Sequence, residues 1–126
     1  MAAMSRFRIP ALGLAVLHAM FAGLTAAVGL FADGGDLWQR LVLVLLHPLG
    51  AAGVLLLVLR SGLARTTIVG VAALLLVNVV ADVTLARMIA MGAVRGDWEL
   101  AAVFAVVPAI GIVYALGLLR PPRATG

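Results

Sequence analysis

The sequence contains no cysteine and no lysine, and charged residues of any kind make up only 11% of its 126 positions. Without cysteine, the chain can form neither disulfides nor thiolate metal sites, and it has no thiol redox chemistry. Soluble domains are about half apolar and about a quarter charged, whereas 65% of this chain is hydrophobic and its mean hydropathy is +1.24. In water such a chain would expose a large apolar surface, so its composition predicts an integral membrane protein.

The charge that is present comes mainly from arginine, which gives a net charge of +4 and a pI near 11.5. In a soluble protein this excess would suggest a nucleic-acid partner. Here the arginines stand singly at the ends of apolar runs, which is typical of residues that orient a membrane protein. We therefore expect the lipid bilayer, and no nucleic acid, as a partner.

Four apolar runs are each long enough to cross a bilayer core, which takes roughly 20 helical residues. They span residues 9–32, 38–59, 66–91 and 98–119. A spanning segment must satisfy its own backbone hydrogen bonds, so these runs are predicted to be helices. Short connections make neighbouring helices antiparallel. The sequence thus predicts an all-α integral membrane fold, an up-down bundle of four transmembrane helices that forms a single membrane domain over residues 1–126.

The distribution of charge predicts an orientation for this bundle. One side would hold six arginines, and the other would hold three arginines mixed with four carboxylates. The first set is Arg6, Arg8, Arg60, Arg65, Arg120 and Arg123, and the second is Arg40, Arg87, Arg95, Asp33, Asp36, Asp97 and Glu99. The positive-inside rule then predicts a multi-pass protein of the cell membrane with both termini in the cytoplasm.

An offset of 60 positions aligns the two halves of the chain without a gap. Three uncommon residue types coincide at this offset, in the pairs Trp38 and Trp98, Pro48 and Pro108, and Arg60 and Arg120. Residues 1–60 and 61–120 are therefore predicted to be two related helical hairpins, as in transporters with parallel repeats. The alternative is that helices entering from the outer face tend to start with tryptophan and end with arginine.

A candidate intramembrane site consists of four strongly polar residues that lie deep within the apolar runs: His18, His47, Asn78 and Asp82. An aspartate at a helix centre costs roughly 2.5–3.5 kcal/mol on insertion scales. Asn78 and Asp82 are four residues apart and share one helix face. Counting residues from the helix ends places His47 level with Asn78, with Asp82 about 6 Å further out and His18 further in.

This cluster has two interpretations. In one, Asp82 titrates beside His47 in a proton-coupled or ion-conducting pocket. In the other, the polar groups only hold helices together, which contributes roughly 0.6 kcal/mol for each pair, or Asp82 lies near enough to the outer interface to reach headgroups. Pro48 and Pro108 would kink their helices and are possible hinges.

Two histidines in a membrane bundle also suggest a haem held by His18 and His47. Their predicted depths differ by about 5 Å, which is awkward for such a haem, so no cofactor is expected. No metal site is expected either. The chain has no Gly-x-Ser-x-Gly, His-Glu-x-x-His or phosphate-loop motif, so it is not expected to be an enzyme.

Small residues recur every fourth position along the first helix, where they allow another helix to approach closely. They are Ala11, Ala15, Ala19, Gly23 and Ala27. The leading expectation is an accessory or structural subunit that packs against other membrane subunits or a second copy of itself. The alternative is a small proton-coupled transporter or ion channel that uses the polar cluster, and the third reading is a haem-binding membrane anchor.

Overall fold

The computed structural model describes residues 2–31 and 37–120, with side chains from residue 9 onward. Helix α1 spans Ala2–Phe31, and the second long helix consists of three consecutive parts: α2 (Leu37–Leu41), the π-helical η1 (Val42–Leu46) and α3 (His47–Leu59). Helix α4 spans Arg65–Ala90, and α5 spans Trp98–Leu119. The part of the chain that the structure describes contains no strand.

The predicted helical segments agree with the structure to within a residue or two, except at the start of the chain. The structure contains four helices long and apolar enough to cross a membrane: Ile9–Phe31, Leu37–Leu59, Arg65–Ala90 and Trp98–Leu119. Helix α1 begins at Ala2, seven positions before the predicted start, because its apolar core is preceded by residues that can continue the same helix. Residues 32–36, which connect the first two predicted helices, lie outside the described residues.

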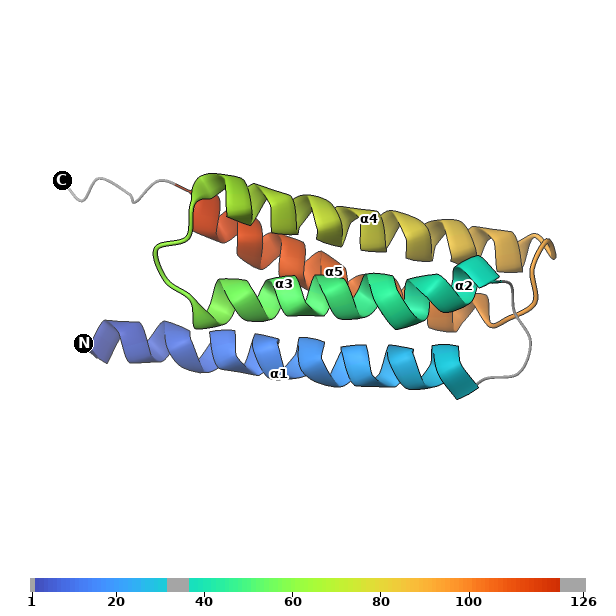
Figure 1. Cartoon of the computed structure of the whole chain (residues 1–126), viewed down its shortest axis with the longest axis horizontal. Helices are drawn as coiled ribbons and strands as arrows, with labels where there is room; N and C mark the ends of the chain where they lie inside the picture. Colours follow the sequence, from blue (N-terminus) through green and yellow to red (C-terminus); the bar gives the residue numbers. More distant parts are fainter. Residues whose placement is uncertain (1, 32–36, 121–126) are drawn as a thin grey trace.

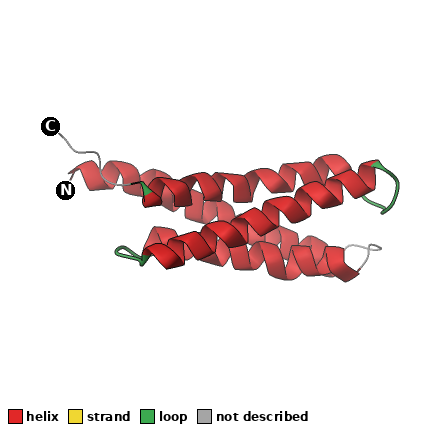
Figure 2. Cartoon of the chain, turned by 90° about the horizontal axis from the view of Figure 1, so that it is seen from above, coloured by secondary structure: helices red, strands yellow, loops and turns green. Residues whose placement is uncertain are grey.

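The helices alternate in direction, so that the start of α1 and the end of α5 lie at the same end of the bundle (Figure 1). A second view shows that the helices cross at shallow angles over their full length (Figure 2). Arg60, Arg65 and Arg120 are exposed at the end that holds the two termini, whereas Arg40, Arg87 and Arg95 belong to the opposite end. The latter is called the α2 end below.

Specific end structures set the lengths of the last two helices. Gly92, with φ +79°, follows α4 and allows the amide of Ala93 to donate to the carbonyl of Met88 and its own amide to donate to that of Ile89. This Schellman arrangement terminates a helix with a left-handed residue, which glycine adopts without steric cost. Asp97 Oδ1 then accepts hydrogen bonds from the amides of Glu99 and Leu100 and caps α5.

The two prolines lie in different local structure. Pro48 follows the π-helical turn η1, where the amide of His47 donates to the carbonyl of Val42, five residues earlier. Pro108 lies inside α5, which continues through it as one α-helix. A π-turn accommodates one extra residue, and His47 follows this one directly. Whether either proline acts as a hinge stays a prediction.

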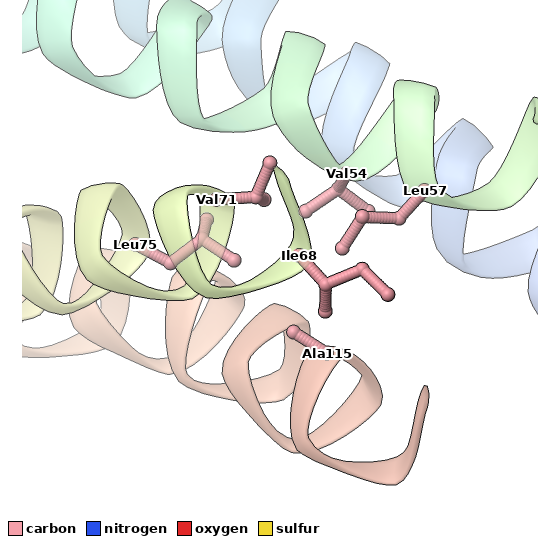
Figure 3. Close-up of a cluster of buried hydrophobic side chains, with 6 residues drawn as sticks. All are labelled: Val54, Leu57, Ile68, Val71, Leu75 and Ala115. Carbon is pink, nitrogen blue, oxygen red and sulfur yellow. The ribbon is translucent and has the colours of Figure 1, made fainter. Parts of the chain in front are cut away.

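A compact apolar cluster fills the bundle on the side toward the termini. Figure 3 shows side chains of α3 and α4 meeting there, with a small residue of α5 beneath them. The members are Val54, Leu57, Ile68, Val71, Leu75 and Ala115, all at most 8% exposed. Many large apolar side chains of all four helices face outward instead, as expected of helices whose outer surface contacts hydrocarbon rather than water.

Candidate functional site

His47 and Asp82 form a direct pair in the middle of the bundle. His47 is the first residue of α3 and Asp82 lies in the C-terminal half of α4. His47 Nε2 and Asp82 Oδ1 are 2.7 Å apart, and each side chain is only 1% exposed. Either an imidazolium donates to the carboxylate or the carboxylic acid donates to a neutral imidazole, and transfer of one proton interconverts the two forms.

Two phenylalanine rings enclose the imidazole of His47. The ring of Phe21 on α1 meets it edge to face with 5.0 Å between centroids, and the ring of Phe104 on α5 lies at 6.3 Å. The two phenylalanines also contact each other edge to face at 5.3 Å. Side chains from all four helices therefore meet at the His47–Asp82 pair, and its surroundings apart from Asp82 are largely apolar.

Asn78 lies one helical turn from Asp82 but takes no part in the pair. Its Nδ2 donates to the carbonyl of Leu74, 2.9 Å away on the same helix. It packs against the backbone of Gly50, where a Cβ atom would come within 2.9 Å of Nδ2. Hence Asn78 lies level with Gly50, and Asp82, rather than Asn78, lies level with His47.

The position of α4 along the bundle axis relative to His47 differs by about one turn from the position obtained by counting residues, which placed Asn78 level with His47. The count assumed that the second and third helices begin at the same height at their arginines. In the structure Arg60 and Ala64 have extended backbone, with ψ of 133° and 144°. The connection therefore displaces the start of α4 along the bundle axis relative to the end of α3.

His18 occupies a separate position on α1. Its Nδ1 donates to the carbonyl of Leu14, 2.9 Å away, so in the neutral ring Nε2 is the unprotonated nitrogen. Nε2 lies close to Gly111 of α5, where a Cβ atom would be only 3.0 Å away. His18 thus faces α5, near Leu75 and Val54, and makes no hydrogen bond to His47.

Each of the four predicted site residues carries one buried polar atom without a hydrogen bond within the described part of the chain. These atoms are His18 Nε2, His47 Nδ1, Asn78 Oδ1 and Asp82 Oδ2. Most buried polar atoms in proteins are paired, and each exception costs about 1–3 kcal/mol. Because all four atoms lie in one bundle interior, the hydrogen bonds within the described residues satisfy only part of the bonding capacity of this polar cluster.

A cavity of about 300 Å³ opens at the α2 end of the bundle. Residues of all four helices and of the α4–α5 connection line it, and Phe104 forms part of its wall. Because Phe104 also contacts the ring of His47, this aromatic ring separates the cavity from the His47–Asp82 pair. Asp82 itself does not line the cavity.

The arrangement does not suit a haem between the two histidines. His47 Nε2 already contacts Asp82, and the free edge of His18 faces the backbone of α5. Coordination of a haem iron by His47 Nε2 would require the His47–Asp82 contact to break. Among the described residues, no group of three His, Cys, Asp or Glu side chains could hold a metal ion.

Sequence reasoning missed the apolar and small residues that shape the site. Phe21 and Phe104 enclose His47, and Gly50 and Gly111 make room for Asn78 and His18. A spacing signal was available on α1, where His18, Phe21 and Thr25 follow one another by three and four residues and all three are buried. That spacing marks one helix face.

Comparisons with protein-family models, with curated proteins and with solved structures found no match to this chain.

Proposed function

We propose that this chain is a multi-pass protein of the cell membrane, with both termini in the cytoplasm, that passes protons through its interior or couples their movement to that of a solute. The observation that carries the proposal is the buried His47–Asp82 contact of 2.7 Å. Aspartate and histidine can exchange a proton across such a contact. Ionisable groups are costly in a membrane interior, so those found there commonly have a function.

The unpaired atoms support proton movement rather than simple attachment of helices. His47 faces Asp82 with Nε2 and leaves Nδ1 without a partner, so its ring can accept a proton at one nitrogen and release one from the other. Asp82 Oδ2 is likewise without a partner. A pair whose only task was to hold α3 against α4 would be more stabilising with these atoms bonded.

The path for protons would be asymmetric. Toward the α2 end, one aromatic layer with Phe104 lies between His47 and the cavity. Toward the termini lie Asn78, His18 and then the apolar cluster around Leu75. We therefore expect the pair to exchange protons more readily with the outer face, and a movement of helices to be needed before a proton reaches the cytoplasmic face.

Proton flux into liposomes tests the proposal. The vesicles contain the full chain and an internal pH-sensitive dye, and an outward potassium gradient with valinomycin gives them a membrane potential that is negative inside. They should acidify faster than protein-free vesicles under the same potential. Asp82→Asn keeps the size of the side chain but cannot carry a proton, so it should reduce the flux to the protein-free level. Glu99→Gln is the matched control, because Glu99 is an exposed carboxylate near the start of α5, and this variant should retain the wild-type rate.

Circular dichroism and size-exclusion chromatography would verify that both variants fold. Equal flux for wild-type protein and Asp82→Asn would contradict the proposal. Infrared spectra recorded at two pH values give a second test, independent of conduction. The C=O band of a protonated carboxyl group should appear in wild-type protein and in Glu99→Gln but be missing in Asp82→Asn.

A second candidate function, an accessory subunit of a membrane assembly, is favoured by one different observation. Ala19, Gly23 and Ala27 of the small-residue stripe are exposed on α1, and a Cβ atom at Gly23 would meet nothing within 4 Å. Such a face lets another helix approach closely. Self-association or a partner subunit would use this face, and proton movement would not depend on it.

A further inference from the structure

A pocket of about 400 Å³ opens at the end of the bundle that holds the termini. This volume lies within the roughly 300–1,000 Å³ of ligand pockets. The end of α3, the connection 60–63 and facing residues of α4 and α5 line it. It is called the terminal pocket below, and it lies at the opposite end of the bundle from the cavity that adjoins Phe104.

The terminal pocket combines an apolar wall with polar side chains at the edge of the span. Leu57 and Ile68 form the buried part of the wall. Arg60 and Ser61 directly follow α3, and Tyr114 lies five residues before the end of α5, or about 8 Å along the helix axis. Tyrosine close to the end of a spanning helix lies at the level of lipid headgroups. The lining therefore suits a molecule with a polar head and an apolar body.

The polar side chains of the terminal pocket are available to a ligand. Within the part of the chain that the structure describes, Arg60, Ser61 and Tyr114 make no side-chain hydrogen bond or ion pair. A guanidinium has five N–H donors and each hydroxyl adds one, and all of them suit the oxygens of a phosphate. Ala64 gives α4 no side-chain cap, so the first amides of this helix add donors beside the pocket.

The charged residues at this end of the molecule are all arginines. The five carboxylate side chains of the chain belong to the interior or to connections at the α2 end: Asp33, Asp36, Asp82, Asp97 and Glu99. Positions 1–8 and 121–126, which adjoin the terminal pocket in sequence, add three arginines and no Asp or Glu. A phosphate here would meet cations only, whereas the ammonium of a zwitterionic headgroup would find no carboxylate side chain.

We infer that the terminal pocket binds an anionic glycerophospholipid, with its phosphate at Arg60 and Ser61 and an ester oxygen at Tyr114. The start of one acyl chain would contact the apolar wall. The remainder of the lipid would lie on the outer surface, where Leu59 and Leu118 at the rim are 62% and 42% exposed. Binding at this end does not depend on proton movement through the His47–Asp82 pair.

Native mass spectrometry of the full chain tests the inference. The protein is held in micelles of a neutral maltoside detergent and titrated with dioleoyl phosphatidylglycerol or dioleoyl phosphatidylcholine, which share the same acyl chains. The inference predicts that one phosphatidylglycerol binds per chain and that this binding saturates. Phosphatidylcholine should bind about tenfold more weakly, because its ammonium offsets the charge-assisted bonds of its phosphate.

Three variants locate the lipid. Arg60→Gln should weaken phosphatidylglycerol binding by about tenfold and remove most of the preference over phosphatidylcholine. Tyr114→Phe keeps the ring and should weaken both lipids by about threefold. Arg65→Gln is the matched control, because Arg65 is an exposed arginine at the same end but does not line the pocket. This variant should change the affinity by less than about twofold.

Four outcomes would overturn the inference. Equal binding of the two lipids would show that the terminal pocket does not select charge. Equal weakening by Arg60→Gln and Arg65→Gln would show diffuse attraction to this end of the bundle. Unchanged affinity in Arg60→Gln would place the lipid elsewhere. Displacement of phosphatidylglycerol by millimolar glycerol 3-phosphate would identify a soluble phosphate ester, rather than a lipid, as the occupant.

Discussion

Glycine residues decide how closely the helices approach one another in the interior. A Cβ atom at Gly53 would lie 2.9 Å from Val71 Cγ1, and one at Gly111 would lie 3.0 Å from each of His18 Nε2, Leu75 and Val54. At Gly29 it would come within 2.7 Å of Val44. The lack of a side chain at these glycines allows the backbones of neighbouring helices to come close together. In a membrane such close packing stabilises the association of helices, where the hydrophobic effect that drives packing in water is missing.

Gly53→Ala would place a methyl group against the side chain of Val71. Val71 cannot yield to the new methyl group by changing rotamer, because its χ1 is restricted in a helix, so α3 and α4 must separate slightly. We expect a loss of about 1–3 kcal/mol in the free energy of unfolding, the usual cost of overpacking. Titration with sodium dodecyl sulfate in mixed micelles, followed by circular dichroism, measures it.

The matched control is Gly70→Ala. Gly70 lies within α4, but a Cβ atom there would meet nothing within 4 Å. Alanine favours helix over glycine by up to about 1 kcal/mol, so this variant should be neutral or more stable. If both variants changed stability equally, the close approach at Gly53 would not be the cause.

For the four buried polar residues, the sequence predicts their importance but not which of them pair. His18, His47, Asn78 and Asp82 were recognisable because each is costly in an apolar run, and all four are at most 2% exposed. Their pairing could not be derived, because it depends on the relative height of α3 and α4. That height is set by a short connection whose backbone geometry local sequence does not specify.

At the scale of helices, the most consequential feature is the π-helical turn Val42–Leu46. One extra residue in a turn rotates everything before it by about 100° relative to a continuous α-helix. The turn thereby sets the direction of Gln39 and Arg40, which line the cavity, independently of His47. The sequence predicts a helix across residues 38–59, but hydropathy does not distinguish a π-turn from an α-turn.

Helix α1 presents the surface most suited to another helix. Ala19, Gly23 and Ala27 are exposed at successive intervals of four residues, beside the larger Val16 and Met20. The sequence alone predicts the stripe but not the side of the helix that it occupies. The structure assigns the other side of α1 to the interior, where Phe21 and His18 lie.

Gly23→Leu would place a large side chain on the exposed small-residue stripe of α1. The side chain would extend into open space in the single chain, so folding should be unaffected, whereas a helix packed on the stripe would be displaced. If the chain self-associates through α1, energy transfer between labelled copies in liposomes should fall to the level expected for random proximity. Gly70→Leu, at an equally open position on α4, should leave the transfer unchanged. Loss of transfer in both variants would place the contact elsewhere or show general misfolding.

At the scale of the whole molecule, polarity is distributed unevenly along the bundle. The half toward the termini contains the apolar cluster around Leu75 and Val54. The other half contains the His47–Asp82 pair and the cavity. Composition and run length were sufficient to predict four helices in antiparallel order, because apolar runs of roughly 20 residues joined by short connections satisfy their backbone hydrogen bonds in a bilayer as helices. The cavity could not be predicted, since it depends on how side chains of all four helices pack against one another at the α2 end.

Orientation in the membrane determines which compartment this cavity faces. In the described part of the chain, five arginines lie toward the end that holds the termini and three toward the α2 end. The first set is Arg6, Arg8, Arg60, Arg65 and Arg120, and the second is Arg40, Arg87 and Arg95. Because positive residues are retained in the cytoplasm and carboxylates contribute little, we expect the α2 end, and with it the cavity, to face outward.

The lack of native cysteine allows this expectation to be tested with single thiols. Ala93 and Ser61 are both exposed, the first in the connection between α4 and α5 and the second in that between α3 and α4. A membrane-impermeant maleimide should label Ala93→Cys in intact cells and Ser61→Cys only after permeabilisation. The reverse pattern would invert the orientation and make the cavity cytoplasmic. Labelling of both variants in intact cells would instead show that copies insert in both directions, in which case a proton path with one open side would work in either sense across the same membrane.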